Sequence, residues 1–257
     1  MILRPLDLSD LNVKNFAALV ALTFATAATA RTFTVINPCS YTVWPAIFTD
    51  LNVGSTTPDQ PTGWEQDPNE VLTFTVPNDW KAGRVWVSLW YPGLHHHCPN
   101  SCIDGGCSGG LECDPHSGTG VPPATLAEFT LGTNGVADNY DVSLVDGFNI
   151  PVAIKNNKGC PVTDCAADLN PDSLLIPVAP SSAASACAAE LGDLVNNPNC
   201  CTGTHNALET CPSSSVESYS YFKDSCPDAY AYAFDDPTGL NHCDSALQAD
   251  YTITFCP

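Results

Sequence analysis

Residues 124–131 read Ala-Thr-Leu-Ala-Glu-Phe-Thr-Leu and predict a β-strand with two different faces. Side chains alternate along a strand, so Leu126, Glu128 and Thr130 share one face. The opposite, uniformly apolar face carries Ala127, Phe129 and Leu131. Phe129 is therefore expected in a core. Glu128 lies on the mixed face, where a cleft residue is expected.

Segments of the same kind lie on both sides of this strand. They are rich in β-branched and aromatic residues and recur at short spacing, which is typical of an all-β fold. The predicted strands are 32–36, 41–44, 71–76, 83–87, 125–131, 140–145, 150–154 and 251–255. The first two are separated by Asn37-Pro38-Cys39-Ser40 and read as a hairpin. Helical signal appears only at 182–195 and 215–234.

Fourteen cysteines are distributed unevenly between these segments. Residues 93–123 hold four and residues 160–226 hold seven. An even count permits full pairing, and thiols at this density persist as disulfides in an oxidising compartment. Neither stretch has enough periodic apolar residues for its own core, so each is expected to depend on bridges. A groove is expected where these stretches meet the β core.

The N-terminus predicts export from the cell. Residues 15–30 are apolar and small, follow Lys14, and end in Ala-Thr-Ala. This pattern is typical of a signal peptide, assigned to residues 1–30, with a mature chain that begins near Arg31. The stretch is shorter than the about 20 apolar residues of a transmembrane helix. We therefore expect a secreted protein, extracellular or in a cell wall, without a transmembrane segment.

The net charge of −20 narrows the range of partners. So acidic a surface repels nucleic acid and anionic lipid and suits neutral or cationic partners. The run His95-His96-His97-Cys98 superficially suggests a metal site. Adjacent histidines on an extended loop point in different directions, however, and no second ligand pair follows at finger spacing. We expect a monomer with no metal and no cofactor.

Several segments, in chain order, carry a family resemblance. They are Cys39-Ser40-Tyr41-Thr42-Val43-Trp44-Pro45, Ala82-Gly83-Arg84-Val85-Trp86, Gly105-Gly106-Cys107-Ser108-Gly109-Gly110-Leu111, residues 122–129, residues 140–149, Cys226-Pro227-Asp228-Ala229-Tyr230 and Thr254-Phe255-Cys256-Pro257. The chain resembles the thaumatin-like proteins, in particular their fungal branch. The resemblance implies one thaumatin-like domain at 31–257. Its β-sandwich core would span 31–92, 121–158 and 244–257. A small disulfide lobe would span 93–120, and a lobe rich in disulfides and short helices would span 159–243.

The resemblance also implies a disulfide pairing, which the spacing alone leaves open. The implied bridges are Cys39–Cys256, Cys98–Cys102, Cys107–Cys113, Cys160–Cys243, Cys165–Cys226, Cys187–Cys200 and Cys201–Cys211. Residues 87–97 depart from the family pattern, either as a genuine loop insertion or as a translated intron.

The family's acidic cleft maps onto five positions of this chain. By motif they are Arg84, Glu128, Asp141, Asp146 and Asp236. Members with such a cleft are commonly linked to the binding or slow hydrolysis of β-1,3-glucan, a fungal wall polymer. Because Asp141 and Asp146 are five residues apart, a straight strand would send them to opposite faces. Both reach one groove only if the strand ends or bends near Val145, and Asp146-Gly147 is a suitable turn.

Glycosidic cleavage needs a protonated acid beside the leaving oxygen and an ionised carboxylate opposite. Crowded carboxylates raise at least one pKa, which favours Glu128 as the general acid. Asp141 or Asp146 would then be the base or nucleophile. The substrate-binding residues are expected to be Arg84, which would keep a neighbouring carboxylate ionised, Asp236, and Phe148, which follows the turn and could stack on a sugar ring.

Two functions remain open on this basis. One is a wall-remodelling endo-β-1,3-glucanase, which is a glycoside hydrolase. The other is a non-catalytic β-glucan-binding or antifungal defence-type protein, because charge in a groove serves binding as well as catalysis. A third role, as an enzyme inhibitor, has no sequence feature of its own.

Overall fold

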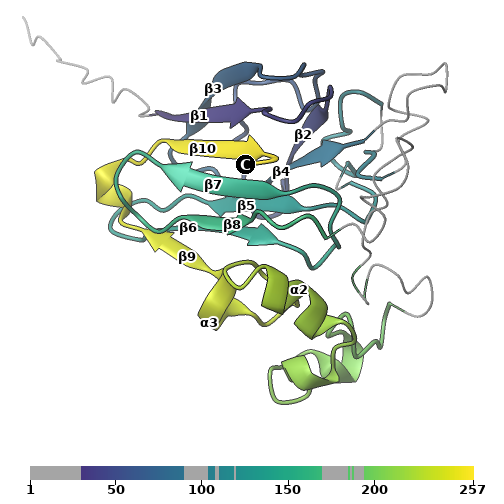
Figure 1. Ribbon diagram of the computed structural model, residues 1–257. Coiled ribbons are helices and arrows are strands. Elements are labelled where there is room, and N and C mark those ends of the chain that lie inside the picture. The colour runs from purple at the N-terminus through teal and green to yellow at the C-terminus, as the bar shows by residue number, and fades with distance from the viewer. Residues whose placement is uncertain are drawn as a thin grey trace, which may run out of the picture.

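The computed structural model describes residues 30–89, 104–107, 110–118, 120–169, 185, 187 and 194–257. In this part of the chain two five-stranded sheets pack face to face (Figure 1). The strands are β1 (Ala30–Ile36), β2 (Trp44–Thr49), β3 (Val71–Pro77), β4 (Gly83–Ser88), β5 (Leu126–Thr130), β6 (Asp138–Ser143), β7 (Val152–Asn156), β8 (Thr163–Cys165), β9 (Asn241–Cys243) and β10 (Tyr251–Phe255). The predicted β-dominated sandwich is confirmed.

The first sheet has the order β3-β1-β10-β7-β8. Its strands β1 and β10 come from opposite ends of the chain and pair in parallel, with Val35 opposite Ile253. The Cys39–Cys256 bridge then joins residues that are 217 positions apart. The two ends of the domain are thus held together by a strand pair and by a covalent link.

The second sheet has the order β2-β4-β5-β6-β9, and every pairing is antiparallel. The predicted hairpin between residues 32–36 and 41–44 is wrong, because β1 and β2 belong to different sheets. The intervening turn is held by Asn37, whose buried side-chain amide donates to the carbonyls of Tyr41, Gln66 and Asp67. The segment after β1 therefore pairs with residues 66–70 instead of folding back on β1.

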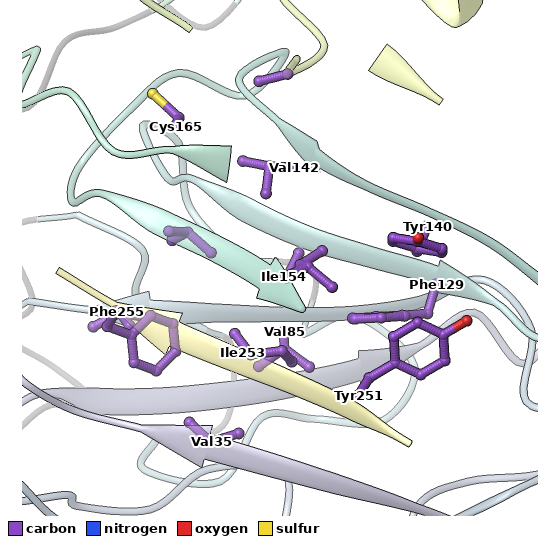
Figure 2. Packing of buried hydrophobic residues seen from close by; sticks show 14 of the residues in the cluster. Val35, Val85, Phe129, Tyr140, Val142, Ile154, Cys165, Tyr251, Ile253 and Phe255 are labelled. Carbon is purple, nitrogen blue, oxygen red and sulfur yellow. The ribbon is translucent and has the colours of Figure 1, made fainter. Parts of the chain in front are cut away.

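Aromatic rings fill the space between the two sheets. Phe129 of β5 packs edge-on against Phe33 of β1, with ring centroids 4.8 Å apart, and against Tyr251 of β10 at 5.4 Å. Tyr140 of β6 completes the group, and Figure 2 shows its ring beside those of Phe129 and Tyr251. The alternation that assigned Phe129 to the core is confirmed by its 2% exposure.

A buried ion pair also joins the two sheets. Arg31 of β1 donates through Nη1 and Nη2 to the two carboxylate oxygens of Asp138 on β6, at 2.5 and 3.1 Å. Asp138 also accepts from the backbone N–H of Gly132 and from the hydroxyl of Tyr251. Both carboxylate oxygens are therefore saturated by donors, as a buried charge requires.

The helices lie on one side of the sandwich, next to β9 (Figure 1). They are α2 (Tyr219–Ser225) and α3 (Asp236–Gly239), with the short 3-10 turns η1 (Gly203–His205) and η2 (Ser213–Ser215) nearby in sequence; η3 (Ser245–Leu247) precedes β10. Within the predicted helical stretch 215–234, the structure thus has one short helix, α2. Most of the 182–195 signal lies outside the described residues, as do residues 1–29 and 90–103.

Six of the seven implied disulfides are confirmed. They are Cys39–Cys256, Cys107–Cys113, Cys160–Cys243, Cys165–Cys226, Cys187–Cys200 and Cys201–Cys211. Cys98 and Cys102 lie outside the described residues. Among the helices that are described, none combines the length and the hydropathy that crossing a bilayer requires.

Candidate functional site

Three charged side chains form a row across the second sheet. Arg84 on β4 lies opposite Glu128 on β5, and Glu128 lies opposite Asp141 on β6. Directly opposed residues of antiparallel strands project from the same face, with Cβ atoms about 4.5–5.5 Å apart. Val85, Ala127 and Val142, one position along each strand, point into the core. The row therefore lies on the face of the sheet that is turned away from the core.

Arg84 is the centre of the ion pairs in this row. Its Nε lies 2.9 Å from Glu128 Oε1, and its Nη1 lies 4.0 Å from Asp146 Oδ2. Asp146 reaches the row because β6 ends at Ser143 and the chain then turns at Gly147, which has a φ of 95°. The bend that the Asp141 to Asp146 spacing required is present.

The helical side of the chain contributes Asp236, the first residue of α3. The Tyr230 hydroxyl donates to Asp236 Oδ1 at 2.6 Å. The Tyr230 backbone is joined to the end of β6 through its N–H to the Val142 carbonyl and its carbonyl to the Leu144 N–H. Gly239 allows α3 to approach closely, because a Cβ there would lie 2.5 Å from the Tyr230 ring. Asp236 is thereby held toward the sheet.

All five charged positions line one cavity of about 390 Å³, together with Tyr230. The lining residues include four carboxylates, and Arg84 is their one cation. The side chains of Arg84, Glu128 and Asp146 remain 36%, 29% and 36% exposed, so the cavity is open to solvent. We refer to it as the acidic pocket.

Asp141 has the most strongly altered protonation in the acidic pocket. Burial, followed by the charge of Glu128, raises its pKa to about 8, with Asp236 adding to the rise and Arg84 opposing it. Its Oδ1 atom is buried and has no hydrogen-bond partner among the described residues. A protonated carboxyl relieves both the desolvation and the repulsion, so Asp141 carries a proton at neutral pH.

Glu128 and Asp146 are affected in the same direction. Desolvation raises the pKa of Glu128, the Arg84 guanidinium lowers it, and Asp146 raises it further. Hydrogen bonds donated to Glu128 by Ser143 and Arg84 also lower this pKa. Burial raises the pKa of Asp146 as well, again opposed by Arg84. Of the two opposed carboxyls, Glu128 has the close cationic partner, which favours its ionised form.

The prediction that Phe148 binds substrate is wrong. This residue was expected to face the groove because it follows a turn, but its side chain is fully buried within the main core cluster. The turn at Gly147 directs residue 148 inward, between the sheets. Tyr230, which is only partly buried, lines the acidic pocket instead. Sequence reasoning missed it, because the aromatic-rich stretch 219–234 has no regular alternation that separates inward from outward rings.

Within the described ranges, no cluster of His, Cys, Asp and Glu has the arrangement of a metal site. The four carboxylates of the acidic pocket are spread along a row and across to α3. The His95–Cys98 run lies outside the described residues.

Comparison with known proteins places these features in a family. Residues 37–257 match the Thaumatin family. Pathogenesis-related protein 5 of Arabidopsis thaliana is 38% identical over 247 residues, covering 93% of this chain and 95% of that protein. Pathogenesis-related thaumatin-like protein 3.5 of Cryptomeria japonica is 37% identical over 248 residues, covering 93% and 95%. These relatives are plant proteins, so membership of the fungal branch stays a prediction.

Among solved structures, a thaumatin-like xylanase inhibitor is 19% identical with a TM-score of 0.43, covering 88% of this chain and 99% of that one. A glycoside hydrolase family 64 laminaripentaose-producing β-1,3-glucanase from Paenibacillus barengoltzii, complexed with laminarihexaose, is 12% identical with a TM-score of 0.48, covering 88% and 74%. At these TM-scores neither likeness informs the site.

Proposed function

Since this chain belongs to the thaumatin family, we propose that it is a secreted protein whose acidic pocket binds β-1,3-glucan. The observation that carries the proposal is the convergence of Arg84, Glu128, Asp141, Asp146 and Asp236 on one cavity. These residues come from three strands, a turn and a helix. Their assembly in one place, on the solvent side of a sheet, supports recognition of a ligand over a structural role.

The chemistry of the acidic pocket suits a neutral polyhydroxyl ligand. Ionised carboxylates accept hydrogen bonds from sugar hydroxyls, and the Arg84 guanidinium donates to sugar oxygens. Tyr230 offers a partly exposed ring at the wall and a hydroxyl that fixes Asp236. The volume of about 390 Å³ lies in the range of about 300–1,000 Å³ that small-molecule sites occupy. One or two sugar units of a longer chain would fill it.

A second candidate function, slow endo-hydrolysis of the bound glucan, is favoured by the protonation of Asp141. A neutral carboxyl with a pKa of about 8 is a suitable proton donor to the glycosidic oxygen. Glu128, paired with Arg84, is the ionised carboxylate that would attack the anomeric carbon or activate a water. The roles are thus exchanged relative to the sequence-based assignment, in which Glu128 was the acid. The direct cross-strand opposition of the two carboxyls favours the short separation of retaining enzymes.

Binding is tested by sedimentation with insoluble linear β-1,3-glucan. We expect the unsubstituted chain to sediment with the polymer, and Arg84→Ala together with Asp236→Ala to release it. Asp224→Asn is the matched control, because Asp224 is an exposed carboxylate on α2 that does not line the acidic pocket. Equal sedimentation of the doubly substituted chain and the control would contradict the proposal.

Hydrolysis is tested by reducing-sugar release from the same glucan. Asp141→Asn is expected to lower the rate by about 10²–10⁴-fold, the usual contribution of a general acid, while sedimentation is retained. Glu128→Gln is expected to lower it as well. If the unsubstituted chain sediments with glucan but releases no more sugar than Asp141→Asn, the protein binds without turnover.

A further inference from the structure

A second and larger hollow lies at one end of the sandwich. Its volume is about 1,010 Å³, and it shares no lining residue with the acidic pocket. The walls come from the beginning of β1, the loop at 56–59, the end of β3, the connection between β5 and β6, and η3. In Figure 1 these elements meet at the left-hand end of the molecule, where β1 and β10 begin. We refer to it as the end hollow.

Most of the residues that line the end hollow have polar side chains, and none of these side chains is cationic. Five side chains carry hydroxyls, three carry amides and two carry carboxylates. The lack of Lys, Arg and His disfavours an anionic ligand. Hydroxyls and amides both donate and accept hydrogen bonds, as does every hydroxyl of a neutral sugar.

Two of the three amide side chains, those of Asn78 and Gln248, are held by hydrogen bonds that extend from the buried ion pair. Arg31 Nε donates to Asn78 Oδ1 at 2.8 Å, and Asn78 Nδ2 donates to Gln248 Oε1 at 2.7 Å. Gln248 Nε2 in turn donates to the Ser245 carbonyl. The chain of hydrogen bonds runs from the core to the surface of the end hollow. Such support preorganises polar groups for a ligand.

From these observations we propose that the end hollow is a second saccharide site, which binds a neutral oligosaccharide separately from the acidic pocket. Its size accommodates several sugar units. Its two carboxylates, Asp59 and Asp79, would accept hydrogen bonds from sugar hydroxyls. The inference stands on the end hollow alone and does not require the acidic pocket to bind glucan.

The test is a calorimetric titration with laminarihexaose as the probe. Ala246→Trp places a large ring in the end hollow, since Ala246 is an exposed lining residue of η3. Leu247→Trp is the matched control, since Leu247 is 44% exposed on the same turn but does not line the end hollow. Ala233→Trp blocks the acidic pocket, which Ala233 lines. Circular dichroism verifies that each variant is folded.

We expect Ala246→Trp to remove one bound hexaose per chain, or to weaken that binding step at least tenfold, while Leu247→Trp changes neither. In the Ala233→Trp background, one hexaose should still bind and should be lost when Ala246→Trp is added. Identical titrations of Ala246→Trp and Leu247→Trp would overturn the second site, as would the absence of any hexaose binding. Binding at the end hollow of a glucosamine hexamer, but not of laminarihexaose or cellohexaose, would overturn the neutral ligand class. Loss of all hexaose binding in Ala233→Trp would also overturn the second site, because the end hollow is intact in that variant. Unchanged binding in Ala233→Trp would instead contradict the proposal that the acidic pocket binds glucan.

Discussion

Arg31 and Arg84 each pair with carboxylates, but the two clusters differ in charge balance. The Arg31 cluster joins two sheets, contains one cation and one carboxylate, and is buried to 1% and 0% exposure. In the acidic pocket, Arg84 alone faces four carboxylates on the open side of one sheet. In the first cluster every oxygen of Asp138 has a donor, whereas in the second Asp141 Oδ1 has no partner among the described residues.

This difference distinguishes a structural cluster from the site that we propose to bind a ligand. A balanced and fully hydrogen-bonded ion pair helps to hold the two sheets together. Removing one partner destabilises the fold, because the other charge is then buried without compensation. An excess of carboxylates costs stability, since like charges repel, and holds a proton that can be transferred. An arginine beside carboxylates therefore stabilises the fold when the charges balance, and leaves a carboxyl protonated when carboxylates are in excess.

The largest effect is expected from Asp138→Asn. The substitution leaves Arg31 buried without a counter-charge, which typically costs about 3–5 kcal/mol. The free energy of unfolding, measured in guanidinium chloride with disulfides intact, should fall by that amount. Asp141→Asn, the same change three residues further along β6 and on its opposite face, should not destabilise the chain at pH 8. Equal losses for the two variants would remove the distinction between the clusters.

The next effect is a pH dependence of stability with an unusual sign. The pKa of Asp141 is about 8 in the folded chain and about 3.9 in an unfolded one, so the folded state binds the extra proton between these values. Protonated Asp141 therefore contributes its full stabilisation of the folded state below about pH 4. This contribution is lost as the pH rises through about 8. Each unit of the pKa difference corresponds to about 1.4 kcal/mol, so stability should fall by roughly this amount per pH unit over most of the range between the two pKa values.

Unfolding free energies measured from pH 4 to 8 should therefore decline more steeply for the unsubstituted chain than for Asp141→Asn, which lacks the titrating group. Asp224→Asn serves as the control, because it removes an exposed carboxylate and should leave the slope unchanged. Parallel curves for the unsubstituted chain and Asp141→Asn would mean that Asp141 has an ordinary pKa.

The smallest effect concerns Tyr230. Tyr230→Phe removes the hydrogen bond to Asp236 but keeps the ring that packs on Gly239, so stability should fall by only about 0.5–1.5 kcal/mol. Glucan affinity should fall less than tenfold, and Tyr230→Ala should lower it more because the ring is lost. Equal affinities for Tyr230→Phe and Tyr230→Ala would show that the ring takes no part in binding.

The sequence was sufficient where a signal was local and periodic. The β10 strand has the predicted bounds, and the two faces of β5 follow its alternation. The bend after β6 was inferred from the spacing of Asp141 and Asp146 and from Gly147, whose positive φ makes the turn. The disulfide pairing came from the family resemblance, because fourteen cysteines alone allow too many connectivities.

What the sequence missed depends on long-range packing. Asn37 gives no local sign that it will bind the 66–67 carbonyls and separate β1 from β2. Phe148 was misplaced because the residue after a turn can point either way. The exchange of roles that we propose between Glu128 and Asp141 depends on which carboxyl lies beside Arg84 and which is more deeply buried. Strand register and depth determine both, and neither is visible in the one-dimensional pattern.

The central claim, that the acidic pocket holds Asp141 protonated at neutral pH, is tested most directly by carbon-13 NMR of the aspartate side-chain carboxyls. The Asp141 signal is assigned by its loss in Asp141→Asn and followed from pH 3 to 10. We predict a titration midpoint for this signal near pH 8. A midpoint close to about 3.9, the ordinary value for aspartate, would contradict the account.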